Sequence, residues 1–315
     1  MIDEDFNPKV SIVIPVYNGA NYMQEAIESA LNQTYNNIEV LVINDGSKDE
    51  TEEIALSYGN RIRYFKKENG GQSSALNFGI EQMKGEYFSW LSHDDVYYPQ
   101  KLEHQIKELS NYTESNIILY SDYDIINNES VKIGEGVTKD TNSDRFRLQL
   151  MLSAPINGCT ALIPKSVFNE VGLFNTLRPH TSDVEAFFNM AGSYKFIHET
   201  EKLVQLRQHS GQMTHKRAKY HNYESNLFLV DALYKMTKID YEQAGEEYPE
   251  ILREIAKNWA QRGYKNAYIK AYKKFKEASK KNTARLQSTI ALRRAYMYKY
   301  IKSRIKYLIY TFRKW

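Results

Sequence analysis

Residues 87–95 read Tyr-Phe-Ser-Trp-Leu-Ser-His-Asp-Asp, an apolar run that stops at two adjacent carboxylates. The aromatic residues and the leucine favour a buried strand, and Asp94 and Asp95 fall where that strand should end. Ligands of open α/β sheets bind beyond the carboxyl ends of the strands, and neighbouring carboxylates repel each other unless they share a cation or a hydrogen-bond donor. Alternatively, one of the two caps a following helix that begins at Pro99. The spacing alone leaves both interpretations open.

Strands and helices alternate through the first 90 residues. β-branched and aliphatic residues predict strands at 10–15, 38–43 and 62–65, and helical spacing of apolar residues predicts helices from Asn21, over 51–59 and over 72–83. This alternation is typical of an α/β fold with a doubly wound, mainly parallel sheet flanked by helices.

Three of these strands end in polar or acidic residues. The first runs into residues 15–18, the second into Asp45, and the fourth into the Asp94/Asp95 pair. Because parallel strands end at one edge of a sheet, we expect the three loops to line one crevice. Gly70 and Gly71 precede a predicted helix and would offer free N–H groups to an anion. The chain lacks the glycine spacings of the dinucleotide-binding loop and the P-loop.

The composition predicts a soluble, globular protein. Of its 315 residues, 42% are hydrophobic and 26% charged. A single cysteine, Cys159, excludes an intrachain disulfide framework and fits a reducing cytoplasm. The first nine residues are polar and acidic, which does not fit a signal peptide, and no apolar run reaches the length of a membrane span. We therefore expect a cytoplasmic protein.

Charge is distributed unevenly along the chain. Residues 278–315 contain eleven Lys or Arg and no Asp or Glu, whereas the preceding 277 residues contain 31 basic and 39 acidic side chains. From about residue 220 helical spacing dominates, so we expect a catalytic domain over 1–218 and a helical region over 219–315. Its basic amphipathic tail, at about 285–315, carries one apolar stripe, formed by Ile301, Ile305, Leu308 and Phe312. This pattern predicts a helix lying on an anionic membrane; the alternative is a bundle helix packed on the body.

Three motifs together resemble family 2 glycosyltransferases of the GT-A fold. They are residues 11–18 (Ser-Ile-Val-Ile-Pro-Val-Tyr-Asn), residues 44–47 (Asn-Asp-Gly-Ser) and residues 92–95 (Ser-His-Asp-Asp). They stand in the order and at the spacing of that family, and the resemblance extends over residues 8 to 215. It implies a GT-A sheet that binds a nucleotide sugar, with the helical region following it.

The resemblance also implies a donor site. In that family the first strand end and the acidic residue of the second loop hold the base and ribose, which here are Pro15, Tyr17, Asn18 and Asp45. The residue chemistry agrees, because Tyr17 can stack on a base and Asp45 can accept the N–H of a pyrimidine imide. For Tyr17, packing at the strand end is the alternative.

The metal assignment comes from the same resemblance. The family motif is Asp-x-Asp or Asp-x-Asp-Asp, and here Ser92 stands in the leading position. We carry the metal role to Asp95 and a ribose or supporting role to Asp94. Residues 203–214 resemble the family's Tyr-Arg-x-His segment, which implies that Arg207 contacts the diphosphate and that His209 is a second ligand of Mn²⁺ or Mg²⁺.

The acceptor side is predicted from two further segments. Residues 181–188 match the family's second carboxylate motif, which makes Asp183 the general base; Glu185 is the alternative base, and an N-cap role is the alternative for Asp183. Residues 157–163 resemble the strand beside the acceptor pocket, in which Cys159 is expected to be buried structure. Residues 127–145 are polar, and we expect an irregular, mobile segment there.

The resemblance implies an inverting, metal-dependent glycosyltransferase with a UDP-sugar donor. The expected acceptor is a glycan linked to a polyprenyl diphosphate at the inner face of the membrane, in the synthesis of capsule, O-antigen or exopolysaccharide; no nucleic acid is expected as partner. One alternative is a nucleotidyltransferase, although residues 14–25 lack the Lys or Arg of its basic loop. The other is an inactive scaffold that binds a nucleotide sugar or a membrane. Ser92, in place of the leading aspartate of the metal motif, would suggest it.

Overall fold

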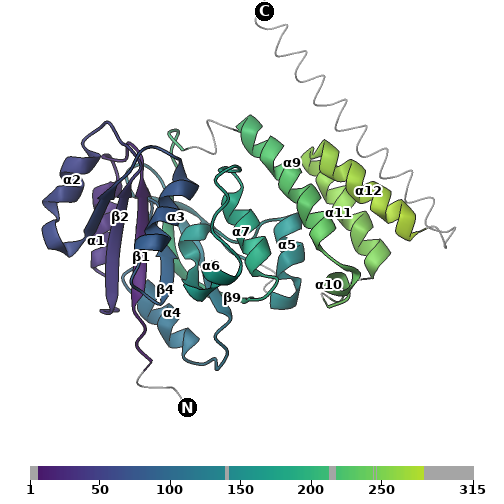
Figure 1. The fold of residues 1–315 in the computed structure, drawn as a ribbon, viewed down its shortest axis with the longest axis horizontal. Helices are drawn as coiled ribbons and strands as arrows, with labels where there is room; N and C mark the ends of the chain where they lie inside the picture. Colours follow the sequence, from purple (N-terminus) through teal and green to yellow (C-terminus); the bar gives the residue numbers. More distant parts are fainter. Residues whose placement is uncertain (1–5, 139–141, 213–217, 244, 246, 280–315) are drawn as a thin grey trace, which may run out of the picture. The chain divides into compact units, whose positions relative to one another are not determined.

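The computed structural model describes residues 6–138, 142–212, 218–243, 245 and 247–279. These residues form two compact units. The first contains the described residues up to Phe146 and those from Pro155 to Gln212. The second contains Arg147–Ala154 and the described residues from Ala218 onward. Within the first unit, nine strands form one sheet with helices against it, which confirms the α/β fold (Figure 1).

Four parallel strands form one half of the sheet. Their order is β3 (Arg63–Lys66), β2 (Ile38–Asn44), β1 (Val10–Val16) and β4 (Tyr87–Trp90). Because all four run in the same direction, the loops that follow β1, β2 and β4 leave from the same edge of the sheet. This edge, called the rim below, carries residues 17–20, 45–49 and 91–95.

The other half of the sheet is mixed in direction. β6 and β9 are parallel, whereas β8, β7 and β5 each run antiparallel to their neighbours. The sheet as a whole is therefore mixed rather than mainly parallel. The bounds are β5 (Val96–Tyr97), β6 (Ile117–Ile126), β7 (Lys132–Gly136), β8 (Leu162–Pro164) and β9 (Lys195–Arg207).

Helices cover the parallel half through small and apolar side chains. α1 buries Met23, Ala26, Ile27 and Ala30, the stripe expected of an amphipathic helix. α3 lies so close to β1 that a Cβ on Gly79 would come 2.4 Å from Val13 Cγ1. Among the described residues of the first unit, the helices are α1 (Met23–Leu31), α2 (Thr51–Ser57), α3 (Gln72–Gln82), α4 (Lys101–Leu109), α6 (Ser166–Glu170) and α7 (Ser182–Met190).

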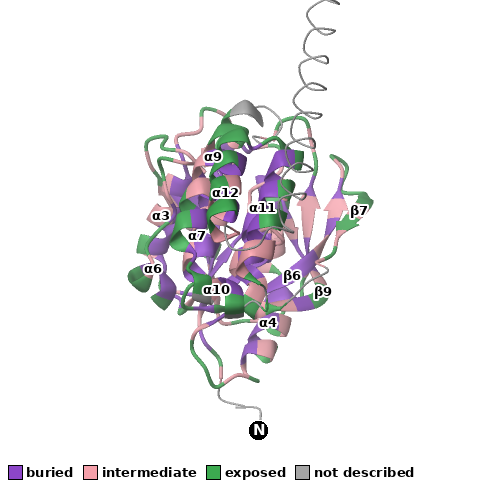
Figure 2. Cartoon of the chain, turned by 90° about the vertical axis from the view of Figure 1, so that its right-hand side faces the viewer, coloured by how far each residue is buried: buried purple, intermediate pink, exposed green. Residues whose placement is uncertain are grey.

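Two segments differ from the expectation. The expected irregular segment at 127–145 contains the ordered strand β7, because a turn at residues 127–131 folds it back against β6; Figure 2 shows much of β7 exposed. The expected strand at 157–163 begins instead as a 3-10 turn, Gly158–Thr160, before β8. Gly158 lies against the ring of Trp90, where a Cβ would come within 2.2 Å of Cζ3, so the chain bends there around the indole.

The second unit is helical, as expected for the C-terminal region. Its helices are α5 (Phe146–Leu152), α9 (Ala218–Lys235), α10 (Lys238–Gln243), α11 (Tyr248–Arg262) and α12 (Lys265–Ala278). Trp259 of α11 is fully buried, and its Nε1 donates to the carbonyl of Met151 at 2.9 Å. None of the helices within the described residues is both long and apolar enough to span a membrane. The predicted amphipathic tail lies outside those residues.

Candidate functional site

The first two rim loops are joined by hydrogen bonds. The N–H of Asn18 donates to Ser47 Oγ at 2.9 Å, and Asn18 Oδ1 accepts from the N–H of Lys48 at 2.8 Å. Asn18 adopts a left-handed backbone conformation with φ of 49°, which asparagine tolerates better than most residues. Tyr17 is left 48% exposed beside this junction. Pro15, within β1, is buried and pairs with Ile43 of β2.

Asp45 holds the turn at Gly70 and Gly71, called the glycine turn below, rather than facing solvent. Its Oδ1 accepts from the Gly70 N–H at 3.0 Å and from Lys67 Nζ at 2.7 Å, and its Oδ2 accepts from the Gly71 N–H at 2.7 Å. Gly71, with φ of 84°, adopts a conformation that favours glycine. The anion that these two N–H groups bind is thus the Asp45 carboxylate. A direct anion contact by Gly71, as expected from the sequence, does not fit this arrangement.

Asp94 and His209 meet at the rim. His209 Nε2 lies 3.0 Å from Asp94 Oδ2, although the two residues are far apart in the sequence. The imidazole also lies against Tyr22 of α1, with ring centroids 5.2 Å apart. The side chains of His209 and Asp94 are 14% and 13% exposed, and His209 Nδ1 accepts from the Gly211 N–H at 3.2 Å.

Asp95 points into the protein instead. Its Oδ1 accepts from the backbone N–H of Arg207 at 2.8 Å, and its Oδ2 accepts from the thiol of Cys159 at 3.3 Å. Burial, followed by the nearby Asp94 carboxylate, raises the pKa of Asp95 to about 8. Both carboxyl oxygens of Asp95 thus accept from protein donors. These contacts link the rim to the end of β9, which favours a supporting role for Asp95 over the expected metal role.

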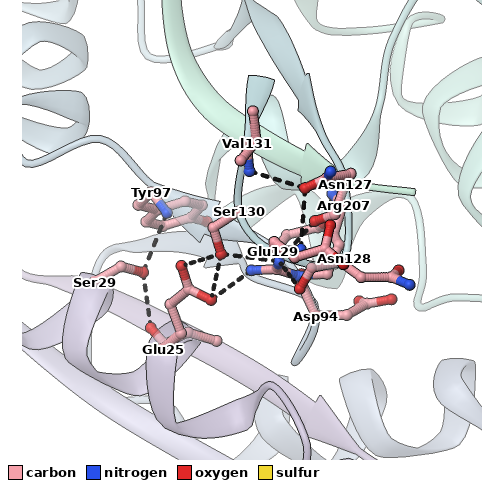
Figure 3. Close-up of polar contacts among 12 residues, drawn as sticks. Glu25, Ser29, Asp94, Tyr97, Asn127, Asn128, Glu129, Ser130, Val131 and Arg207 are labelled. Atoms are coloured by element: carbon pink, nitrogen blue, oxygen red, sulfur yellow. Dashed lines mark hydrogen bonds and ion pairs between the residues drawn. The ribbon is translucent and has the colours of Figure 1, made fainter. Parts of the chain in front are cut away.

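The guanidinium of Arg207 is also turned inward, with the side chain 1% exposed. Figure 3 shows its contacts with the Asp94 loop, α1 and the β6–β7 turn. Each of its three nitrogens has a protein acceptor. The expected contact of Arg207 with a diphosphate does not fit this geometry, because the groups that would bind phosphate are occupied.

Asp183 and Glu185 both lie in the first turn of α7, and Asp183 Oδ1 accepts from the Val184 N–H at 2.8 Å. Glu185 Oε2 accepts from Asn175 Nδ2 at 3.2 Å and lies 3.5 Å from Arg178 Nη1, so it holds the preceding loop against the helix. The N-cap of α7 is Thr181, not Asp183. The hydroxyls of Ser182 and Ser73 are 2.7 Å apart, which joins this turn to the start of α3.

The cap interpretation of the Asp94/Asp95 pair does not hold either. α4 begins at Lys101 with Gln100 as its N-cap and no side-chain cap hydrogen bond, so Pro99 precedes the helix. Cys159 is buried, as expected, and burial raises the pKa of its thiol well above the usual value.

Several residues of this region carried no sequence signal. Lys67 supplies the cation beside Asp45, and the His93 ring packs so tightly under Gly19 that a Cβ there would come 2.4 Å from Cδ2. Glu25 and Ser130, which contact Arg207, lie on a helix face and in a polar turn. Such positions look like ordinary surface residues, so only the fold reveals their partners.

The donor set of the Asp94–His209 pair fits a divalent cation that is shared with a ligand. No group of three or more His, Cys, Asp or Glu side chains arranged to hold a metal occurs among the residues that the structure describes. Mg²⁺ commonly takes one or two carboxylates plus substrate phosphates, and imidazole with carboxylate suits Mn²⁺. Two protein ligands therefore suffice if phosphate oxygens and water complete the shell.

Comparisons with known proteins agree with the motifs. The model of "Glycosyl transferase family 2" matches residues 11–172. A Rickettsia typhi protein described as an uncharacterized glycosyltransferase is 44% identical over 277 residues, covering 86% of this chain and 85% of its own length. Matches with uncharacterized glycosyltransferases of Rickettsia felis and Rickettsia bellii cover 39% and 34% of those longer proteins.

Two solved structures share the fold. TarS residues 1–349 from S. aureus, in complex with UDP-GlcNAc, align with a TM-score of 0.61 at 17% identity, over 86% of this chain and 81% of that one. The mannosyltransferase PcManGT from Pyrobaculum calidifontis, in complex with GDP-Man and Mn²⁺, aligns with a TM-score of 0.59 at 16% identity, over 98% and 87%. The family match, the relative and the shared fold together show that this chain is an enzyme and belongs to glycosyltransferase family 2.

Proposed function

We propose that this enzyme transfers a sugar from a nucleoside diphosphate sugar, UDP being the expected nucleotide, to a glycan hydroxyl with inversion at the anomeric carbon. The observation that carries the proposal is the Asp94–His209 pair, at the rim where β1, β2 and β4 end. This is where a ligand of an open α/β sheet binds. The relatives that bind UDP-GlcNAc and GDP-Man share this fold.

The nucleoside would lie against the first two rim loops. Tyr17 offers an exposed ring for stacking on the base, and Asn18 keeps the two loops together. Asp45 would act on the base through the glycine turn that it shapes, and its Oδ2, which accepts from the Gly71 N–H, would also accept from a pyrimidine imide.

We assign the cation to Asp94 and His209 rather than to Asp95. The partly exposed carboxylate and imidazole face the rim together, whereas the Asp95 carboxyl is committed to Arg207 and Cys159. A Mn²⁺ or Mg²⁺ ion bound there would neutralise the charge that develops on the leaving diphosphate. The contact between His209 Nε2 and Asp94 Oδ2 is the one that the cation would replace, with both atoms then turned to the ion.

Asp183 is the proposed general base for the acceptor hydroxyl. It lies in the turn of α7 that Ser182 fixes to the start of α3, next to the glycine turn of the donor side. Glu185 is the alternative base, and Asn175 and Arg178 contact its carboxylate. A positioned base takes up the acceptor proton as the new glycosidic bond forms and the bond to the diphosphate breaks.

The acceptor is proposed to be a growing glycan on a polyprenyl diphosphate, with the enzyme held at the inner face of the membrane. The distribution of basic residues supports this proposal. α12 exposes Lys265, Lys270, Lys273 and Lys276, and the sequence from Ala278 onward adds eleven basic and no acidic residues. Anionic lipid attracts such segments.

Nucleotide release tests the proposal. The enzyme is incubated with UDP- and GDP-sugars, with Mn²⁺, Mg²⁺ or EDTA, together with short glycan acceptors. We expect cation-dependent release of a nucleoside diphosphate and inverted anomeric configuration of the product by NMR. Release of pyrophosphate from a nucleoside triphosphate would indicate a nucleotidyltransferase. Nucleotide-sugar binding without turnover on any acceptor would indicate a scaffold.

A further inference from the structure

Arg207 joins three segments that are far apart in the sequence. Its Nε donates to the carbonyl of Asp94 at 2.9 Å, and its Nη1 donates to the Asn127 carbonyl at 2.9 Å and to Ser130 Oγ at 3.0 Å. Its Nη2 pairs with the Glu25 carboxylate of α1. We call these four partners with Arg207 the Arg207 clamp, and Figure 3 shows them around the guanidinium.

The partners of Arg207 also bind one another. Ser130 Oγ donates to both carboxylate oxygens of Glu25, at 2.9 and 3.1 Å. The turn itself is tied by Asn127, whose Oδ1 accepts from the N–H groups of Glu129 and Val131. The guanidinium therefore docks onto a turn that is already shaped. Its planar fork of N–H donors suits such a site better than the ammonium group of a lysine does.

The clamp contacts Asp94 directly and reaches His209 through the ring of Tyr22. Arg207 holds the Asp94 main chain by its Nε, and its guanidinium lies over the Tyr22 ring, with Cζ 4.5 Å from the centroid. The same ring contacts the imidazole of His209. The backbone N–H of Arg207 binds Asp95, which fixes the next residue of the rim. One side chain thus constrains the loop that carries Asp94 and the ring against which His209 packs.

We propose that Arg207 is a positioning residue that holds Asp94 and His209 in the geometry that binds the cation, and that Glu25 and the β6–β7 turn stabilise it in that role. The inference rests on the proposed function, because it needs the pair to bind a cation with the nucleotide. It excludes a direct contact between Arg207 and the diphosphate. Residues that support metal ligands typically change metal affinity about 10- to 100-fold when replaced.

The test measures UDP affinity by calorimetry with Mn²⁺ and in EDTA, for the wild type, Arg207→Lys and Glu25→Gln. We expect Arg207→Lys to reduce the Mn²⁺-dependent gain in UDP affinity about 10-fold or more, and Glu25→Gln to reduce it less, while affinity in EDTA stays at the wild-type value. Glu25 is 42% exposed in its side chain, so Glu25→Gln should fold even if Arg207→Lys does not.

Arg63→Lys is the matched control. Arg63 also binds a carboxylate, Glu39, at 2.7 Å and a main-chain carbonyl, that of Gln82, at 2.9 Å, but on β3 and away from the rim loops. Arg63→Lys should lose a comparable ion pair without changing the gain in UDP affinity that Mn²⁺ provides. If Arg63→Lys reduced that gain as much as Arg207→Lys, a general loss of stability would explain both, and the proposal would be overturned.

Two other results would also overturn the proposal. Weaker UDP binding in EDTA with unchanged uridine binding would mean that Arg207 contacts the diphosphate itself. An unchanged Mn²⁺-dependent gain in both clamp variants would mean that the clamp does not act on the cation. If the wild type bound neither UDP nor GDP, the proposed function would fail. Hydrogen exchange then still tests the clamp, which predicts faster exchange at residues 94–96 and 127–131 in Glu25→Gln and unchanged exchange in Arg63→Lys.

Discussion

His209 Nε2 and Asp94 Oδ2 lie 3.0 Å apart at the carboxyl edge of the sheet, 115 residues apart in the chain. β9 brings the histidine there, because its last residue, Arg207, is fixed to Asp95 and to the Asp94 carbonyl. The carboxylate of Asp94 and the imidazole of His209 therefore meet at the edge from which the loops after β1, β2 and β4 leave the sheet.

Replacing the proposed base should slow the chemistry and leave donor binding intact. Asp183→Asn keeps the size of the side chain but removes its basicity, so kcat should fall by roughly 10²-fold or more, with KM for the donor nearly unchanged. Steady-state kinetics with a saturating soluble acceptor measure this. Glu185→Gln is the control two residues away and should keep most of the activity, since Glu185 holds Asn175 and Arg178. The opposite ranking of the two variants would transfer the base role to Glu185.

Replacing Asp45 should weaken donor binding more than catalysis. Asp45→Asn removes the charge that binds Lys67 and the two glycine N–H groups, so the turn at Gly70 and Gly71 should loosen. The base is bound equally in the ground and transition states, so KM should rise while kcat at saturating donor changes little. Initial rates over a range of donor concentrations check this. A large drop in kcat with unchanged KM would contradict a binding role.

Lys101 should make stability depend on pH. The side chain is fully buried, donates to Gln105 Oε1 and Ser89 Oγ, and burial lowers its pKa to about 7. The unfolded chain keeps this proton up to about pH 10.4. Between pH 7 and 10 the unfolded state thus binds more protons, and the free energy of unfolding gains up to about 1.4 kcal/mol per pH unit from this group.

Lys101→Met should remove that contribution, so its stability relative to the wild type should be greatest at pH 6 and decline as the pH rises to 10. Urea unfolding at several pH values measures the difference. Lys107→Met, at an exposed position of the same helix, is the control and should follow the wild type. A constant difference between Lys101→Met and the wild type at all pH values would show that Lys101 keeps its ordinary titration.

Removing the basic tail should separate membrane binding from donor binding. Deletion of residues 286–315 should sharply reduce co-sedimentation with anionic vesicles, because each basic residue near such a surface contributes on the order of 1 kcal/mol. UDP binding should persist, since every donor motif precedes residue 215. Activity on a lipid-linked acceptor should fall while activity on a short soluble acceptor remains.

A full-length variant with Lys299, Lys302 and Lys306 replaced by Gln keeps the length of the tail and should lose vesicle binding in part. Raising the salt concentration should weaken wild-type binding in the same direction. If the deletion instead caused aggregation and loss of UDP binding, the tail would be a packing element of the body.

The sequence predicts the parallel half of the sheet well. β1, β2 and β4 are short, mostly apolar runs bounded by turn residues, and such runs identify buried strands without any tertiary information. β7 escaped prediction because Lys132–Gly136 is a short, exposed edge strand with two glycines. Its pairing comes from the Asn127 turn and the length of β6, which no local pattern shows.

The sequence predicts which segments form the candidate site, but not which role each of their residues has. A turn in which the Asp95 N–H donates to the Ser92 carbonyl at 3.1 Å separates two adjacent carboxylates, one toward the rim and one toward Cys159. Sequence spacing cannot tell which of the two faces outward. The inward direction of Arg207 depends likewise on Glu25 and Ser130, which come from separate elements.

Direct Mn²⁺ titration in the presence of UDP tests the central claim most sharply, because Asp94 and Asp95 are adjacent and form a matched pair. Calorimetry is performed on the wild type, Asp94→Asn and Asp95→Asn, with thermal unfolding to verify the fold of each. We expect Asp94→Asn to abolish measurable Mn²⁺ binding and to leave UDP affinity in EDTA unchanged. Asp95→Asn should bind Mn²⁺ with an affinity within about 10-fold of the wild type, which is the smaller of the effects typical for a residue that supports a metal ligand. Wild-type Mn²⁺ affinity in Asp94→Asn together with its loss in Asp95→Asn would contradict the account.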